Sequence, residues 1–158
     1  MSIRLWFIAL AHSSLGQFMQ NSKWGFAVIE TFHLAALALL GGCVLLIDLR
    51  LLGLILKNES ASVISRDLSR LFLGSLTVMI VSGFALLSEE ALKCFASPAF
   101  RWKMALLAAA VLFYFTFHRH ALRQLGKGLP TLQSRFAGIV SLSLWLGVGV
   151  AGRAIGLL

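Results

Sequence analysis

The feature that most limits the fold is the run from Leu34 to Ile47, which holds only apolar and small residues. A membrane-spanning helix needs about 20 predominantly apolar residues, because each residue advances about 1.5 Å through a hydrocarbon core about 30 Å thick. Extended back to Trp24, this run is long enough to cross a bilayer, and three further apolar segments follow it. We therefore expect an all-α protein, an integral membrane four-helix bundle, with spans at roughly residues 24–47, 71–87, 100–117 and 136–157.

The composition indicates one membrane domain that covers residues 1–158. Hydrophobic residues make up 59% of the chain and charged residues 13%, whereas soluble domains carry about 25% charged residues. No Pro- or Ser-rich linker divides the chain. The net charge of +8 would favour nucleic acid binding in a soluble protein, but here the basic residues follow the apolar segments. We therefore expect a lipid bilayer as the partner, and no nucleic acid.

Residues 1–22 contain an apolar run that is too short to span a bilayer. Arg4 precedes a short apolar stretch, so a signal peptide is one alternative. We favour an N-terminal interfacial amphipathic helix, with Trp6 and Phe7 at the depth of the lipid headgroups.

The distribution of basic residues predicts the orientation of the spans. Eight Lys and Arg residues follow the first and third spans, and six lie on the other side. Two of those six, Lys103 and Arg153, are expected within spans, which leaves eight against four. Because basic loops stay in the cytoplasm, we expect both termini outside.

Four ionisable residues are predicted to meet in the outer half of the bundle. His33 comes nine residues after Trp24, which places it about 13 Å below the outer edge, and Glu30 lies one helical turn above it. Lys103 and Arg153 reach the same depth from the third and fourth spans. Ionisable residues within spans are costly and usually functional. Two alternatives stay open: an ion pair of Glu30 with Lys103 or Arg153 that only neutralises charge, and a hydrogen-bonded His33 between helices.

A second group of ionisable residues marks the inner ends of the spans. Its members are Asp48, Arg50, Arg70, His118, Arg119 and His120. We expect Asp48 and Arg50 to cap the first span, and His118 and His120 to belong to a basic cluster at the membrane interface.

The outer group predicts a b-type haem site. A histidine in a four-helix membrane bundle is the usual axial ligand of such a haem, so His33 is the candidate ligand of the iron. Gly41, two turns below His33, would leave room for a flat porphyrin, and Lys103 and Arg153 would pair with its propionates. His118 lies about 20 Å deeper and cannot bind the same iron. The second axial ligand stays open between His12, Met19, Lys103 and water.

Several short motifs lie along the chain: Glu30 and His33 followed by Gly41-Gly42, the stretch Asp48 to Gly53, Ser82-Gly83, Phe100 to Lys103, Phe117 to Arg119, and Trp145 followed by Gly152-Arg153. With these motifs, the chain resembles an uncharacterised bacterial family of four-span membrane proteins, the DUF6644-type proteins. The resemblance covers nearly the whole chain and implies no particular activity. With the multi-pass pattern, it implies the bacterial inner membrane as the location.

A looser likeness connects the run from His33 to Gly42 and the pair Trp102-Lys103 with two other families. Similarity to HemJ-type protoporphyrinogen oxidases implies that His33 binds haem and that Lys103 is an essential partner. Similarity to CopD-type copper-resistance proteins implies that His33 handles a metal ion. The chain lacks the Cys- or Met-dense clusters that copper handling favours.

These observations favour a membrane-embedded b-type haem protein, with electron transfer or oxidoreduction near the outer face and a quinone or porphyrin as partner. A haem-dependent membrane oxidoreductase is the corresponding enzyme class. One alternative is a small-ion or copper transporter or channel, in which Glu30, His33, Lys103 and Arg153 line the pathway. The other is an accessory subunit, whose small-residue stripes bind a partner membrane subunit or a second copy of the chain.

Overall fold

The computed structural model describes residues 3–55, 61–121 and 131–155, and residues 61–67 by their backbone alone. Every regular element in these ranges is helical, which confirms the all-α prediction. Four helical segments are long and apolar enough to cross a membrane. They are α3 (Lys23–Leu51), the Leu68–Glu89 part of α4 (Ala61–Glu89), the stretch Pro98–Ala121 that includes α6 (Pro98–Phe113) and the π-helix η1 (Tyr114–His118), and α8 (Leu132–Ile155). The chain is thus a multi-pass membrane protein.

The spans differ from the predicted ranges mainly at their ends. Helix α3 continues four residues beyond the predicted end at residue 47, because Asp48 and Leu51 are buried within the bundle. Helix α8 begins four residues earlier than predicted, at Leu132. Residues 156 and 157 of the predicted fourth span lie outside the described part of the chain.

Serine caps determine where two of the spans begin. Ser22 Oγ accepts a hydrogen bond from the Gly25 N–H at 3.0 Å, at the start of α3. Ser97 Oγ accepts one from the Phe100 N–H at 3.4 Å, and Pro98 occupies the first turn of α6. These caps accept hydrogen bonds from N–H groups that have no partner within the helix. Proline suits the first turn because it has no backbone N–H that would need an acceptor.

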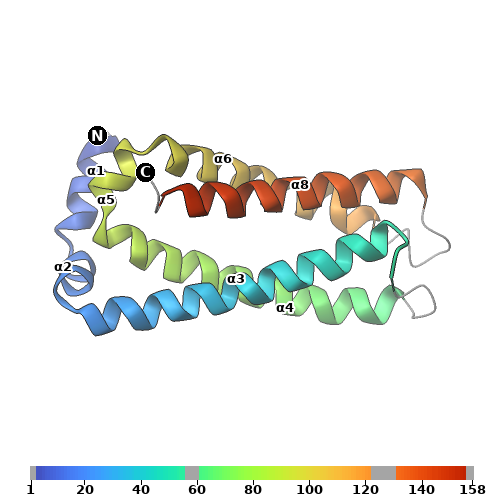
Figure 1. The fold of residues 1–158 in the computed structure, drawn as a ribbon, viewed down its shortest axis with the longest axis horizontal. Helices are drawn as coiled ribbons and strands as arrows, with labels where there is room; N and C mark the ends of the chain where they lie inside the picture. The colour runs from blue at the N-terminus through green and yellow to red at the C-terminus, as the bar shows by residue number, and fades with distance from the viewer. Residues whose placement is uncertain (1–2, 56–60, 122–130, 156–158) are drawn as a thin grey trace.

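Residues 1–22 contain two short helices, α1 (Ile3–Ala11) and α2 (Ser14–Asn21), in place of the single helix we expected. Ser13 ends the first and caps the second, since its Oγ accepts from the Gly16 N–H at 3.1 Å. Together with α5 (Ala91–Ala96), these helices lie across one end of the bundle (Figure 1). Phe7 packs α1 against this end of the bundle, with its ring centroid 5.3 Å from that of Phe95 in α5 and 6.3 Å from that of Phe100.

The spans form two helix pairs, α3 with α4 and α6 with α8. The two pairs are connected by the contact of α3 with α8. The pairs lie close together at the start of α8 and diverge toward α1, α2 and α5 (Figure 1). Gly138 permits the close approach, because a Cβ there would lie only 3.0 Å from the Asp48 carbonyl oxygen. Ser134 Oγ lies 3.4 Å from the Leu51 carbonyl oxygen one turn earlier. The bundle is therefore closed at this end and open at the other.

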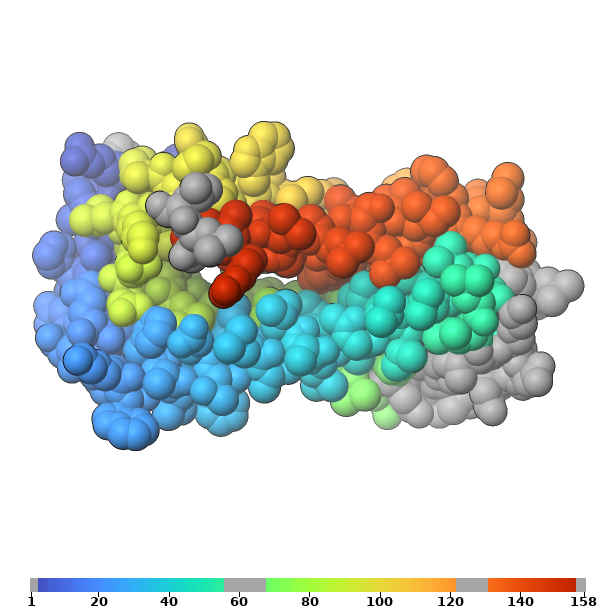
Figure 2. Space-filling model, viewed as in Figure 1, coloured from blue at the N-terminus to red at the C-terminus, as the bar shows by residue number. Residues whose placement is uncertain are grey.

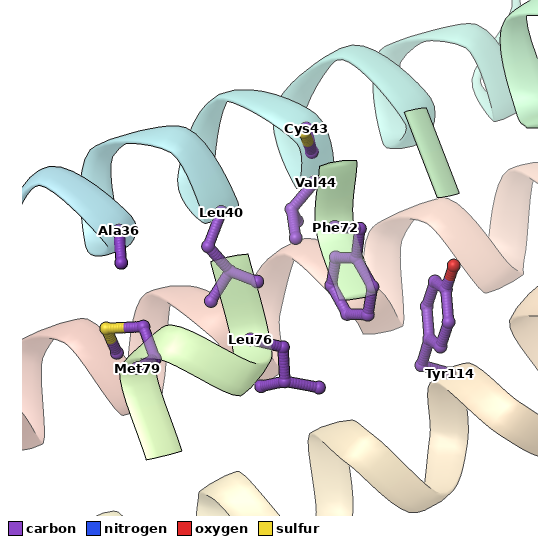
Figure 3. Close-up of a cluster of buried hydrophobic side chains, with 8 residues drawn as sticks. All are labelled: Ala36, Leu40, Cys43, Val44, Phe72, Leu76, Met79 and Tyr114. Carbon is purple, nitrogen blue, oxygen red and sulfur yellow. The ribbon is translucent and has the colours of Figure 1, made fainter. Parts of the chain in front are cut away.

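The central core connects the two pairs (Figure 3). The Phe72 ring, fully buried on α4, stacks on Tyr114 with centroids 4.0 Å apart and meets Trp145 of α8 edge-on at 5.6 Å. In a bilayer, helices associate through close packing, since lipid tails are as apolar as the side chains. Phe72 thus connects α4 to Tyr114 and Trp145 of the other pair, beside the contact of α3 with α8.

Candidate functional site

A cavity of about 390 Å³ lies where the helix pairs diverge, and it is lined by residues of α3, α4, α5, α6 and α8. Figure 2 shows the hollow between the C-terminal part of α8, in red, and α3, in blue. Its ionisable lining residues are Glu30, His33, Glu89, Glu90, Cys94, Lys103 and Arg153. Most of the other lining side chains are apolar, and small-molecule sites typically enclose about 300–1,000 Å³. The cavity is therefore large enough to hold a small amphipathic ligand.

Four of the five predicted site residues line this cavity: Glu30, His33, Lys103 and Arg153. The fifth, Gly41, is not among its lining residues, and a Cβ at Gly41 would meet no atom within 4 Å. The ion pairs found in the described part of the chain are Lys93–Glu90 and His118–Asp48, so neither Lys103 nor Arg153 neutralises Glu30 at ion-pair distance. The alternative in which Glu30 forms such a pair is therefore not supported.

The imidazole of His33 points into the bundle and is held by Ser82 of α4. Ser82 Oγ donates to the Val78 carbonyl oxygen at 2.6 Å and lies 2.8 Å from His33 Nδ1. A hydroxyl has only one proton to donate, so Ser82 Oγ accepts a hydrogen bond from His33 Nδ1–H. The proton then resides on Nδ1, and Nε2 keeps a free lone pair. The contact joins α3 to α4, so it matches the alternative of a hydrogen-bonded His33 between helices. Histidines that bind metals also donate their other ring N–H to a fixed oxygen, so the same contact is compatible with a ligating His33.

Gly83 brings the backbone of α4 against the same imidazole. A Cβ at this position would lie 3.2 Å from His33 Cε1, tighter than ordinary contact. The space beside His33 thus comes from a glycine on the neighbouring helix and not from Gly41, eight residues along the same helix. The only sequence signal for this contact was the small pair Ser82-Gly83 within an apolar span.

The cationic wall of the cavity comes from the other helix pair. Lys103 of α6 extends along Gly152 of α8, where a Cβ would lie 3.5 Å from Lys103 Cε and 3.6 Å from Nζ. Arg153 is the next residue in α8 and also lines the cavity. A ligand between the pairs could therefore contact an imidazole from α3 and two cations from α6 and α8.

Cys94 lies outside the spans, in α5, at the edge of the cavity. Burial raises the pKa of the Cys94 thiol, and the neighbouring Glu90 carboxylate raises it further. The thiol is therefore protonated at neutral pH, and the thiolate is the form that binds metals. Across the described residues, no group of three or more His, Cys, Asp or Glu side chains could hold a metal ion. The donor set thus does not favour a site for a bare metal ion.

The inner ionisable residues are arranged differently from our expectation. Asp48 and His118 are 0% and 2% exposed and form a pair, with His118 Nε2 and Asp48 Oδ1 2.6 Å apart. The expectations of a cap at Asp48 and an interfacial cluster at His118 were wrong. Counting residues along a helix gives the depth of a side chain but not the direction in which it points, and the π-helix η1 turns His118 inward.

The fold and the cavity define a class: a small membrane protein with four long apolar helices and an amphipathic cavity near one end of its bundle. The chain belongs to DUF6644, a family of unknown function, whose sequence pattern matches residues 7–158. No curated protein and no solved structure matches the chain. The looser likeness to HemJ-type and CopD-type proteins stays a prediction.

Proposed function

We propose that this protein binds b-type haem within the membrane, through His33 Nε2, and takes part in electron transfer or oxidoreduction. The observation that carries the proposal is the 2.8 Å contact between His33 Nδ1 and Ser82 Oγ. Since Ser82 Oγ also lies 2.6 Å from the Val78 carbonyl oxygen and donates to it, we assign the ring proton to His33 Nδ1. Within the described residues no partner engages Nε2, which leaves it available to iron. Ligating histidines generally donate their other ring N–H to a fixed oxygen in this way.

The other residues of the cavity suit haem better than they suit a bare ion. Haem brings its own four nitrogen ligands, so a single imidazole is sufficient to hold it, as a proximal histidine does in many haem proteins. Lys103 and Arg153 supply the positive charge that two propionates need. Apolar side chains, among them Leu37, Leu86 and Val148, would cover the porphyrin faces. When bound, haem would supply one-electron chemistry.

The distribution of basic residues predicts which side of the membrane the cavity faces. We infer that both termini lie outside the bacterial inner membrane, which places the cavity near the outer face. A quinone dissolved in the bilayer is the redox partner that such a position favours.

An absorption spectrum of the purified protein tests the proposal directly: a Soret band and an α-band that changes on dithionite reduction are expected. If the protein is expressed with ample haem and shows neither band, the proposal is wrong.

Replacing Ser82 with alanine should weaken haem binding by about 10- to 100-fold, the usual effect of removing an outer hydrogen-bond partner of a ligating histidine. The imidazole stays but loses the acceptor that fixes its tautomer. Haem titration of the apoprotein measures the change. Ser75→Ala is the matched control, because its hydroxyl bonds the Leu71 carbonyl oxygen on the same helix at 2.8 Å. Equal affinities for the two variants would count against the proposed role of Ser82.

Replacing Gly83 with alanine should change the haem spectrum and lower the affinity several-fold, because the new Cβ would press on His33 Cε1 at 3.2 Å. Gly74→Ala makes the same change on the same helix where no atom lies within 4 Å of the new Cβ. The comparison thus separates crowding at the imidazole from a general effect on α4. Indistinguishable spectra and affinities for the two variants would show that the ligand does not depend on the position of this ring.

A further inference from the structure

A buried acid–base pair lies at the closed end of the bundle, separate from the cavity. Asp48 of α3 and His118 of η1 are essentially inaccessible, and their Oδ1 and Nε2 atoms lie 2.6 Å apart. Neither residue lines the cavity. Asp48 follows His33 by fifteen residues of one helix, which amounts to about 22 Å. The pair therefore needs an explanation that does not depend on haem.

The pair has unused hydrogen-bonding capacity in a place where water is excluded. Asp48 Oδ2 and His118 Nδ1 are both buried, and neither makes a hydrogen bond of ordinary geometry within the described part of the chain, although the Ser141 hydroxyl is a polar neighbour of the carboxylate. A buried ion pair offsets its desolvation only when its remaining polar atoms are also satisfied. A pair that served only to join two helices would be a poor solution here, because an apolar contact would join them at lower cost. The open atoms instead indicate a site that exchanges a proton or a water molecule.

The local backbone also points to a functional site. The single π-turn Tyr114–His118 interrupts an otherwise α-helical span, and such π-bulges occur frequently at functional sites. It places the Tyr114 ring on the His118 imidazole, with centroids 5.2 Å apart and planes inclined by 30°. Tyr114 is itself stacked on Phe72. The imidazole is thus held in one orientation toward Asp48.

We propose that Asp48 and His118 form a proton-binding site within the membrane, which takes up and releases one proton as a unit. The protonated pair has no net charge, whether it exists as carboxylate with imidazolium or as carboxyl with neutral imidazole. Release of the proton to water leaves a net charge of −1. A net charge is costly in an apolar interior. The fraction of pairs that hold the proton therefore depends on nearby charges and on the access of water. Groups this close titrate together and not singly.

Polar and charged groups surround the pair on several helices. The uncharged Ser141 of α8 lies next to the Asp48 carboxylate, and Tyr114 covers one face of His118. Among the side chains that the structure describes, the charged or titratable groups nearby in sequence or on the helices packed around the pair are Cys43 and Arg50 of α3, Arg70 of α4, Tyr114, Arg119 and His120 of the third span, and Arg135 of α8. Arg70, Arg119, His120 and Arg135 are exposed at the surface of the bundle. Asp48 and His118 pair with each other.

The test uses the full-length protein in lipid nanodiscs, without haem. Nitrogen-15 NMR of labelled histidine reports protonation of His118, and infrared difference spectroscopy reports protonation of Asp48, from about pH 5 to about pH 10. The chain has four histidines, so the variants His12→Ala, His33→Ala and His120→Ala identify the His118 signal by elimination. We expect the Asp48 and His118 signals to change with one common midpoint, and with one proton in total.

Asp48→Asn is the sharpest variant, because it keeps the shape and the acceptor oxygen but removes the charge. We expect it to move the His118 midpoint by at least about one pH unit, the usual effect of an adjacent charge. His12→Ala should leave that midpoint unchanged. If the Asp48→Asn protein does not fold, the common midpoint in the wild type decides the question. No titration of either group across the range, or two separate midpoints that Asp48→Asn leaves in place, would overturn the proposal.

Discussion

Replacing His33 with alanine is expected to abolish haem retention, with a fall of at least about 100-fold in affinity, because loss of the axial ligand should exceed the 10- to 100-fold cost of losing an outer partner. His33 is the only histidine among the described residues that line the cavity. Without it, the iron would have no imidazole, and contacts of Lys103 and Arg153 with the propionates would remain. The ratio of haem to protein after purification, read from the absorption spectrum, measures the effect.

His12→Ala is the control for this experiment. His12 lies between α1 and α2 and does not line the cavity, so its removal should leave the haem content unchanged. Gel filtration and circular dichroism of both variants would show whether either is misfolded. A His33→Ala protein that is folded and retains the full haem content would refute the assignment of the iron ligand and, with it, the proposed site.

Replacing Phe72 with alanine is expected to lower the free energy of unfolding by about 3 kcal/mol, at the lower end of the cost of removing a buried phenylalanine. The ring is 0% exposed and contacts both Tyr114 and Trp145. Its loss would leave a cavity between the two helix pairs that lipid cannot fill. Reversible unfolding in mixed detergent micelles, followed by circular dichroism, would measure the change.

Phe136→Ala is the matched control, since the Phe136 side chain is 66% exposed on α8 and faces outward. A change below about 0.5 kcal/mol is expected, as for most substitutions at exposed positions. If both variants lower the free energy of unfolding by the same amount, the contact between the helix pairs does not depend on Phe72. If neither variant lowers it, the packing drawn in Figure 3 contributes little to folding.

The spans were predictable because one physical requirement governs them. A bilayer core of fixed thickness demands about 20 apolar residues for each helix, so the length of an apolar run reveals a span without knowledge of its neighbours. The same rise per residue placed Glu30, His33, Lys103 and Arg153 at one depth, and all four line the cavity. Depth depends on position along one helix, which is a local property of the chain.

Contacts between helices were not predictable in this way. The approach of α4 to His33 depends on Gly83 and Ser82, and the approach of α8 to Asp48 depends on Gly138. Neither contact can be derived from the hydrophobic pattern, because that pattern does not specify which helices are neighbours. Gly41, on the same helix as His33, is not among the residues that line the cavity, and its role beside a porphyrin stays a prediction.

The sequence by itself determined that this chain has four helices long and apolar enough to cross a membrane, and it predicted that Glu30, His33, Lys103 and Arg153 lie at one level of the bundle. The tertiary structure alone decided the rotation of each helix about its axis, which helices pair, and where the pairs separate. These properties selected Ser82 as the partner of His33 and brought Asp48 to His118. The physical reason is that depth follows from one helix and one bilayer, whereas rotation and pairing follow from the packing of all the helices together.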